Sequence, residues 1–405
     1  MKRTAKIYGV ELPIERLETS YVTHTLSGYE LVTAIEVAST RSESQALEIE
    51  FDTPDLVNIQ FTDNTEWIGH PEDIQELYGI KGKVKRDAID EDYLFEPHIF
   101  DTGSSNRNGV KRALVKLLTI FKPKKPTAFL MKELAAAFDG KVQPRPQLYQ
   151  MTKDFRKKEV ADMAQGKNLL LIHGTLSNVE GSFGGLLPNG AYERLFERYD
   201  GNVIALEHYT LSESPLENAL YFLNALPDDV LIDMDIISHS RGGLVADILA
   251  KCDQNNAGDT IGFSSDELRI VKKHDIVSHD LMLQINEAVL HKKITVGKVV
   301  RVACPASGTT ILSKRIDHFF NLLLNSISLA FGITSPLYSI VKSFVLELVA
   351  QKEDPSVLAG LNSMMPESYF QKMLNSADTE VASTLYTISG DAEVDGLNFN
   401  SLKVI

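Results

Sequence analysis

The stretch Asp235-Ile-Ile-Ser-His-Ser-Arg-Gly-Gly-Leu-Val245 decides the fold of this 405-residue chain. Residues 230–237 are mostly apolar and β-branched, as in a strand that is buried on both faces of a parallel sheet. Residues 244–251 are good helix formers. Between the two segments, Ser238, Ser240 and Gly242 form a small-x-Ser-x-Gly pattern. The stretch therefore predicts a strand, a sharp turn and a helix that follow one another directly.

This pattern is that of a nucleophile elbow, with serine in place of the usual first glycine. A serine that projects from so tight a turn brings the residues two before and two after it close together. Both must be small, and Ser238 and Gly242 are. Ser238 fits the central position less well, because Ile236 would then lie on the crowded flank. Ser240 is therefore the candidate nucleophile, although serine at such a junction also occurs as a plain helix N-cap.

Strands and helices alternate around the elbow. The segments that read as strands are 167–175, which ends in His-Gly-Thr, 202–209, 230–237, 299–304 and 384–389, and those that read as helices are 191–199, 214–226 and 244–251. Such alternation predicts an α/β fold, in which helices flank a mostly parallel sheet. We assign residues 161–405 to this domain.

The first 105 residues have a different pattern. Residues 29–37 and 46–51 alternate apolar and polar side chains, and residues 55–69 read as a hairpin. Residues 1–105 are therefore expected to form a small β-rich N-terminal domain. Residues 106–160 are expected to be a linker with connecting helices, one of them in the basic amphipathic stretch 110–121. Transient contact of that helix with a membrane surface is the alternative interpretation.

Three segments, in this order, resemble the lipase/esterase branch of the α/β-hydrolase fold. They are His173-Gly174-Thr175, the elbow, and Ala303-Cys-Pro-Ala-Ser-Gly-Thr309. With the segments 173–178 and 207–215, they resemble more narrowly a lipase-like domain of large bacterial proteins, some of which carry caspase-like (CHAT) peptidase domains. The resemblance implies a serine hydrolase that acts on an acyl ester. It also implies an oxyanion hole made by the backbone N–H groups of Arg241 and of Thr175 or its neighbour Gly174.

The family order places an acid and then a histidine after the serine. Asp391 is the candidate acid and Asp395 a second one, but the last histidine of the sequence precedes both. One explanation is that the acid and the histidine lie beyond Ile405, which the strand-like end of the sequence favours. Another is a degenerate or truncated hydrolase that serves as an interaction or regulatory part of a larger bacterial effector. The third is an earlier histidine in an unusual position: His274, His279, His291 or His318.

Residues 319–341 carry no charge. Gly332 and Pro336 interrupt this run, so two amphipathic helices fit it better than a membrane span does. We expect an apolar cap around residues 312–350, inserted where lipases carry a lid; a permanently packed cap or a patch that docks a protein partner is the alternative. The apolar cap makes a lipid or another apolar acyl ester the expected substrate. Protein partners would bind through the cap or the N-terminal domain.

Composition restricts the partners and the compartment. A net charge of -14 argues against nucleic acid as a partner. Cys252 and Cys304 give no disulfide framework, and the N-terminus has no secretory apolar region, so a cytoplasmic setting is expected. No Cys/His spacing is typical of a metal site, and neither a metal nor a cofactor is expected.

Overall fold

The computed structural model describes the chain in residues 3–14, 29–37, 45–52, 55–62, 65–71, 115–123, 131–143, 145–160, 166–256, 261–309, 320–321, 324–325, 328, 338, 341–342, 344–346, 349, 358–376 and 384–389. The chain divides into two compact units. The first unit comprises Met1–Leu130, Arg315–Glu353 and Ala392–Ile405, and the second comprises Met131–Lys314 and Asp354–Asp391.

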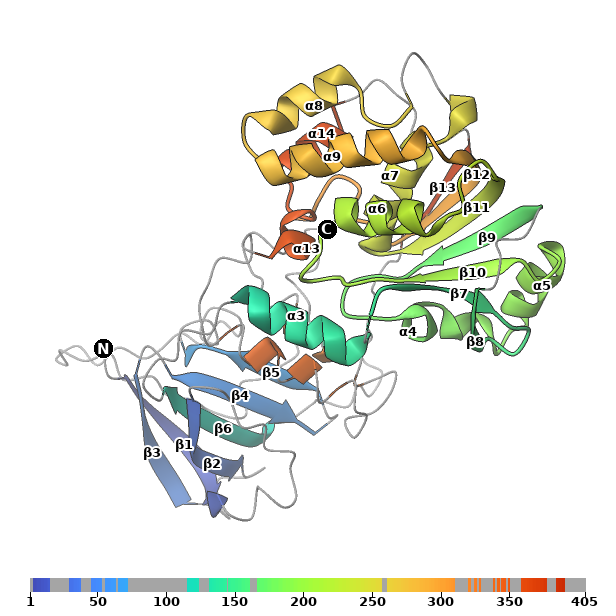
Figure 1. The fold of residues 1–405 in the computed structure, drawn as a ribbon. Coiled ribbons are helices and arrows are strands. Elements are labelled where there is room, and N and C mark those ends of the chain that lie inside the picture. The colour runs from blue at the N-terminus through green and yellow to red at the C-terminus, as the bar shows by residue number, and fades with distance from the viewer. Residues whose placement is uncertain are drawn as a thin grey trace, which may run out of the picture. The chain divides into compact units, whose positions relative to one another are not determined.

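The second unit contains a seven-stranded mixed sheet in the order β13-β12-β11-β9-β10-β7-β8 (Figure 1). Strands β9 to β13 run parallel to one another, whereas β7 pairs antiparallel with β10 and with β8. The strands are β7 (Gln147–Met151), β8 (Lys157–Glu159), β9 (Lys167–Ile172), β10 (Val203–Glu207), β11 (Leu231–His239), β12 (Lys293–Val302) and β13 (Thr384–Ile388). The strand segments expected in the α/β region are thus present, with boundaries that differ by a few residues.

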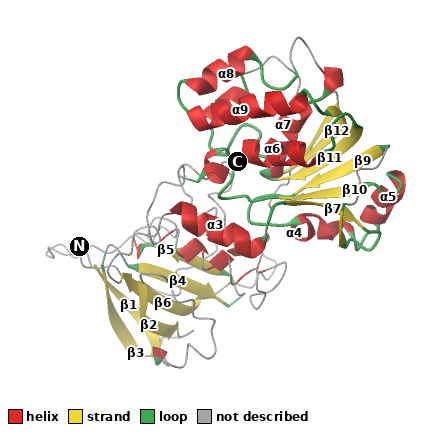
Figure 2. Cartoon of the chain, in the orientation of Figure 1, coloured by secondary structure: helices red, strands yellow, loops and turns green. Residues whose placement is uncertain are grey.

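Helices cover both faces of this sheet (Figure 2). Helices α4 (Val179–Phe183) and α5 (Ala191–Arg198) lie on one face, and α6 (Pro215–Ala225), α7 (Gly242–Lys251) and α9 (Ile276–Val289) on the other. The other helices whose bounds the described residues give are α3 (Met131–Val142), η3 (Gly184–Leu186), η4 (Gln254–Asn256), α8 (Ser265–Lys272), α13 (Ala359–Asn362) and α14 (Tyr369–Leu374). An α/β architecture of three layers results, as the alternating sequence pattern predicts.

The side chains of β9 show why the sheet needs both helical layers. Leu169 and Leu171 pack with Val179 and Tyr192 from the α4–α5 side. Leu170 and Ile172 alternate with them and are also almost completely buried. A strand with apolar residues at successive positions is stable only if both faces of its sheet are covered.

The chain changes direction around β9. Strand β10 follows β9 in sequence and lies on one side of it, whereas β11 lies on the other side. The next helices, α4 after β9 and α7 after β11, therefore lie on opposite faces of the sheet (Figure 1). In open α/β sheets, ligands bind outside the carboxyl ends of the strands at such a switch point. The carboxyl ends of β9 and β11 are where a site is expected.

The first unit contains a six-stranded antiparallel sheet in the order β3-β1-β2-β6-β4-β5. Its strands are β1 (Arg3–Glu11), β2 (Tyr29–Val37), β3 (Gln45–Phe51), β4 (Leu56–Phe61), β5 (Glu66–Gly69) and β6 (Val115–Pro123). One face carries an apolar core that includes Ile35, Ile59 and Trp67. This unit is β-rich, as the alternating sequence pattern indicates.

The connecting helix expected in residues 110–121 is wrong, because β6 occupies Val115–Pro123. The apolar spacing there is compatible with a helix. However, Leu118 and Ile120 join the core on one face, while Leu117 packs with Ala34 in a second cluster. Pairing with β2 and β4, which are distant in sequence, outweighs the local pattern.

The described residues of the apolar segment 320–349 are helical and belong to the first unit. Asn321 accepts the N–H of Ile68 and donates to its C=O, both at 2.8 Å. Asn325 does the same for Glu66, at 2.8 and 3.0 Å. These amides complete the backbone hydrogen bonds of edge strand β5, which would otherwise be open to pairing. A capping role for this segment over the second unit stays a prediction.

The helices within the described ranges include none that combines the length and the apolar character needed to cross a membrane.

Candidate functional site

Ser240 lies between the last residue of β11 and the first residue of α7. Its φ angle is 50°, in the left-handed region that non-glycine residues rarely adopt. The Ser240 N–H donates to the Val302 carbonyl at 2.8 Å, and the Ser240 carbonyl accepts the Gly243 N–H at 3.0 Å. A strained backbone that neighbouring strands hold in place is a common property of functional sites.

The small residues around Ser240 allow close backbone contact. A Cβ atom at Gly242 would lie 2.5 Å from the His173 carbonyl oxygen and 2.6 Å from that of Ile172. Ser238 is fully buried, and its hydroxyl donates to the Val300 carbonyl at 3.2 Å. The elbow is therefore packed directly between the ends of β9 and β12.

The turn after β9 also approaches Ser240. A Cβ atom at Gly174 would lie 2.7 Å from the Cβ atom of Ser240, so a larger residue there would displace the serine. Among the described residues, nothing accepts the backbone N–H of Thr175 or that of Arg241. The N–H of Gly174 donates to Ser182 Oγ at 3.3 Å, and that of Leu176 to Thr210 Oγ1 at 3.0 Å. Of the N–H groups of Gly174, Thr175 and Leu176, only that of Thr175 therefore has no acceptor among the described residues.

His173 orients the peptide group that carries the Thr175 N–H. Its Nδ1 lies 3.0 Å from the Gly174 carbonyl oxygen, and because a carbonyl only accepts, Nδ1 carries the proton. In a trans peptide the C=O and the N–H point in opposite directions. The Thr175 N–H therefore points away from His173.

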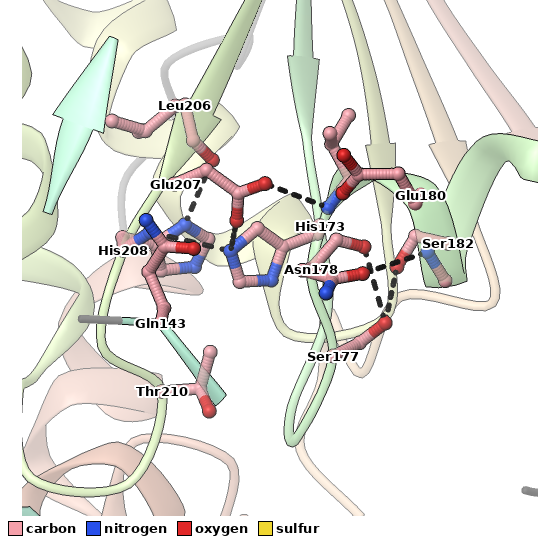
Figure 3. A network of polar contacts seen from close by, with 12 residues as sticks. Gln143, His173, Ser177, Asn178, Glu180, Ser182, Leu206, Glu207, His208 and Thr210 are labelled. Carbon is pink, nitrogen blue, oxygen red and sulfur yellow. Dashed lines mark hydrogen bonds and ion pairs between the residues drawn. The ribbon is translucent and has the colours of Figure 1, made fainter. Parts of the chain in front are cut away.

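Glu207 contacts His173, at the start of this turn, and the backbone of the following helix (Figure 3). Its carboxylate accepts the Val179 N–H at 3.1 Å and lies 2.5 Å from Lys157 Nζ and 3.1 Å from His173 Nε2. Burial opposes ionisation, but the hydrogen bond and charge of His173 and the charge of Lys157 outweigh it and lower the pKa of Glu207 to about 2. His173 Nε2 also lies 3.2 Å from the backbone nitrogen of His208. If Nε2 carries a proton, it donates to Glu207; if it does not, it accepts the His208 N–H.

No histidine in the described part of the chain hydrogen-bonds to Ser240. His208 stacks on His173 with ring centroids 4.0 Å apart, and burial and the charges of His173 and Arg241 lower its pKa. His239 Nδ1 lies 3.3 Å from Ser182 Oγ, and burial and the charge of His173 lower its pKa. The other candidates have different neighbours: His274 stacks on Tyr369, His279 contacts Asp280, and the carbonyl of His291 accepts the Asp229 N–H. Asp391, Asp395 and His318 lie outside the described residues.

Sequence reasoning assigned a role only to the backbone of Arg241, yet its side chain is fully buried behind the elbow. The guanidinium donates to the Gly360 carbonyl at 3.2 Å, to Asn218 Oδ1 at 2.9 Å and to the Glu213 carbonyl at 2.5 Å. Burial lowers the pKa of Arg241 to about 10, although the charges of nearby carboxylates oppose this, so it stays cationic at neutral pH. It ties the elbow to α6 and α13.

Sequence reasoning also missed Asp139, in the last turn of α3, which accepts hydrogen bonds from the loop after β10. One signal was available. A carboxylate near a helix C-terminus is repelled by the helix dipole, so its presence indicates a partner elsewhere in the fold.

Glu213 leads to a prediction on stability. Burial and the charges of Glu217 and Asp139 raise the pKa of its carboxyl to about 7, although Asn218 donates to it at 2.7 Å. The native state therefore binds more protons than the unfolded state between the ordinary pKa of 4.5 and pH 7, so the free energy of unfolding should fall as the pH rises through this range. Urea unfolding at several pH values should show this fall in the wild type and a smaller one in Glu213→Gln.

Asp247 is a second buried carboxyl group whose titration affects stability in this pH range. Burial raises its pKa to about 6, against the opposing charge and hydrogen bond of Arg301. The free energies of unfolding of the wild type and Glu213→Gln should therefore be compared above pH 6. An identical pH dependence there in wild type and Glu213→Gln would contradict the assignment to Glu213.

The described residues contain no group of three or more His, Cys, Asp and Glu side chains that could hold a metal ion.

The comparisons with known proteins give a family and a set of similar structures. A family model described as "Domain of unknown function (DUF7379)" matches residues 141–266 and 275–404. No curated protein matches the sequence. Lipase 1 from Pelosinus fermentans is 13% identical, with a TM-score of 0.32, over 55% of this chain and 67% of that chain.

Two further similar structures are Staphylococcus hyicus lipase and EstA from Clostridium botulinum. The lipase is 14% identical, with a TM-score of 0.26, over 55% of this chain and 66% of that chain. EstA is 11% identical, with a TM-score of 0.28, over 62% of this chain and 68% of that chain. The chain thus spans about two thirds of the length of these structures.

Proposed function

The chain belongs to the family described as a domain of unknown function (DUF7379), and from this premise we propose that it is a serine hydrolase of the lipase/esterase type with an α/β-hydrolase fold. The observation that carries the proposal is the conformation of Ser240. It is a non-glycine residue with a φ of 50° at a direct strand-to-helix turn, next to Gly174 at the switch point of the sheet. A plain helix N-cap has an extended backbone instead.

In the proposed reaction, Ser240 Oγ attacks the carbonyl carbon of an acyl ester. The Thr175 and Arg241 N–H groups stabilise the negative charge that develops on the carbonyl oxygen, and each such donor contributes about 3 kcal/mol. The alcohol leaves and water hydrolyses the acyl-enzyme. We propose Asp391 as the acid that orients a histidine base, which the described histidines do not supply.

The proposed substrate is a lipid or another apolar acyl ester. The apolar segment 312–350 supports this choice, since a lid that opens exposes apolar surface to acyl chains. Protein contacts through this segment or through the first unit belong to the same proposal. Cys252 and Cys304 are both free thiols, in keeping with the proposed cytoplasmic setting.

Labelling with a fluorophosphonate probe tests the role of Ser240. The wild type and Ser265→Ala should be labelled, whereas Ser240→Ala should not be. Turnover of a p-nitrophenyl ester should fall at least about 10³-fold in Ser240→Ala, as expected when a catalytic nucleophile is lost. Ser265→Ala is a matched control, because it removes the hydroxyl of an exposed serine at the first position of α8.

A non-catalytic module is the second candidate function. It is favoured by one observation: in the described part of the chain, Ser240 Oγ has no histidine partner. A folded wild-type chain that neither reacts with the probe nor hydrolyses esters would rule out the enzyme in this form. That result would support a degenerate hydrolase fold that binds protein partners.

A further inference from the structure

We infer that Thr210, held in place by Asp139, is a positioning residue for the oxyanion hole. The inference rests on the proposed function and names two side chains that neither the nucleophile pattern nor the oxyanion pattern includes. Asp139 lies in α3, which comes before all the parallel strands β9 to β13 in the sequence. Thr210 belongs to residues 207–215, which begin with the last residue of β10, and the proposed mechanism assigns no role to Thr210.

Thr210 holds one of the two peptide groups that flank Thr175. Its Oγ1 accepts the Leu176 N–H at 3.0 Å, and both side chains are buried. The other peptide group is held through the Gly174 carbonyl by His173 Nδ1. With both peptide planes fixed, the direction of the Thr175 N–H is fixed as well. Leu176 has a φ of 54°, so this turn needs such external support.

Asp139 fixes Thr210 in turn. Its buried carboxylate accepts three successive backbone N–H groups, those of Thr210 at 3.1 Å, Leu211 at 3.1 Å and Ser212 at 2.8 Å. It also accepts the hydroxyl groups of Thr210 at 3.4 Å and Ser212 at 2.7 Å. Successive N–H groups around one anion form a nest, and here the anion is a side chain of the same unit.

The hydroxyl of Thr210 therefore lies between a hydrogen-bond acceptor, the Asp139 carboxylate, and a donor, the Leu176 N–H. It donates to a carboxylate that can only accept, so its lone pairs remain for the Leu176 N–H. The Thr210 side chain is thus set in one orientation from α3, and this orientation is passed to the turn that carries Thr175. Asp139 and Thr210 need not touch the substrate.

Thr210→Val tests the inference with little change in shape, because valine replaces only the hydroxyl by a methyl group. The Leu176 N–H loses its acceptor and the Thr175 N–H loses its fixed direction. We expect kcat for a p-nitrophenyl ester to fall about 10- to 100-fold, while KM changes little. This fall does not exceed the one that removal of a complete oxyanion donor causes. Thr210→Ser restores the hydroxyl and should retain most of kcat.

A trifluoromethyl ketone gives a second readout, because serine converts it into an oxyanionic adduct. Its affinity should fall in Thr210→Val by about the same factor as kcat/KM, a change that a general loss of packing would not produce. Asp139→Asn, which removes the charge but keeps the size, should lower kcat in the same direction and serves as the second variant if Thr210→Val does not fold.

The outcomes separate this inference from the proposed function. A wild type without fluorophosphonate labelling would overturn both. An active wild type with an unchanged kcat in folded Thr210→Val or folded Asp139→Asn would overturn the inference alone. So would a loss in Thr210→Ser equal to that in Thr210→Val. A fall in kcat for Thr210→Val with rescue in Thr210→Ser would support it.

Discussion

A chain that starts at residue 131 is expected to aggregate rather than to fold as a free α/β domain. Its deletion boundary removes all strands of the first unit but leaves the segment Arg315–Glu353, which belongs to that unit. Among the described residues, this segment buries Phe320, Leu324, Val341, Phe344, Val345 and Leu346 almost completely. Each loses about 1.5–3 kcal/mol of favourable burial when exposed, and together they would form a large apolar patch.

The polar contacts of the segment would be lost in the same deletion. Asn321 and Asn325 would lose the backbone of β5, and Lys342 would lose Glu66, whose carboxylate lies 2.5 Å from its Nζ. The Val349 carbonyl would lose His70 Nε2, now at 2.9 Å. Size-exclusion chromatography after expression should show aggregates or insoluble protein.

A second variant makes this prediction specific. In it, the deletion is combined with replacement of residues 315–353 by a flexible Gly/Ser linker of about 10–15 residues. If the exposed segment causes the aggregation, this double variant should be soluble and show a cooperative unfolding transition. A soluble, monomeric chain from the simple deletion would contradict the prediction.

Gly242→Ala is expected to have the second large effect. The new Cβ atom would lie 2.5 and 2.6 Å from two backbone carbonyl oxygens at the end of β9, His173 and Ile172. These atoms cannot move aside without separating β9 from β11, which pair as far as Ile172 and Ser238. Overpacking of this kind costs about 1–3 kcal/mol even where side chains can adjust. Here we expect the free energy of unfolding, measured with urea, to fall by more than about 3 kcal/mol. Fluorophosphonate labelling should be lost as well.

Gly140→Ala is the matched control, because a Cβ atom at Gly140 would meet no atom within 4 Å. Gly140 lies inside helix α3, where alanine is preferred over glycine by about 0.5–1 kcal/mol. This variant should therefore be as stable as the wild type or slightly more stable. A Gly242→Ala protein with wild-type stability would show that the start of α7 can move away from β9.

The local parts of the site could be predicted from sequence because they depend on neighbouring residues. The elbow needs a strand, a helix and small residues two positions from Ser240, and all of these lie within the 22 residues 230–251. The parallel strands that flank it follow from the alternation of apolar runs and helical patterns. These elements are formed at nearly the expected boundaries.

The remaining parts depend on contacts between residues that are far apart in sequence. Residues 115–123 have a spacing that suits a helix, and their pairing with β2 and β4 makes them a strand instead. Asp139 and Thr210 are 71 positions apart, so no motif spacing relates them. The hydrogen bonds between Asn321 and Ile68 join residues 253 positions apart, and no local pattern predicts them.

This last separation has a consequence during protein synthesis. A ribosome adds about 5–20 residues per second, so about 10–50 s pass between the appearance of Ile68 and that of Asn321. During this time the edge of the nascent N-terminal sheet is without the asparagine side chains that later cover it, while strands β7 to β12 of the α/β unit emerge. Chaperones that bind exposed strands have their longest opportunity to act in that interval.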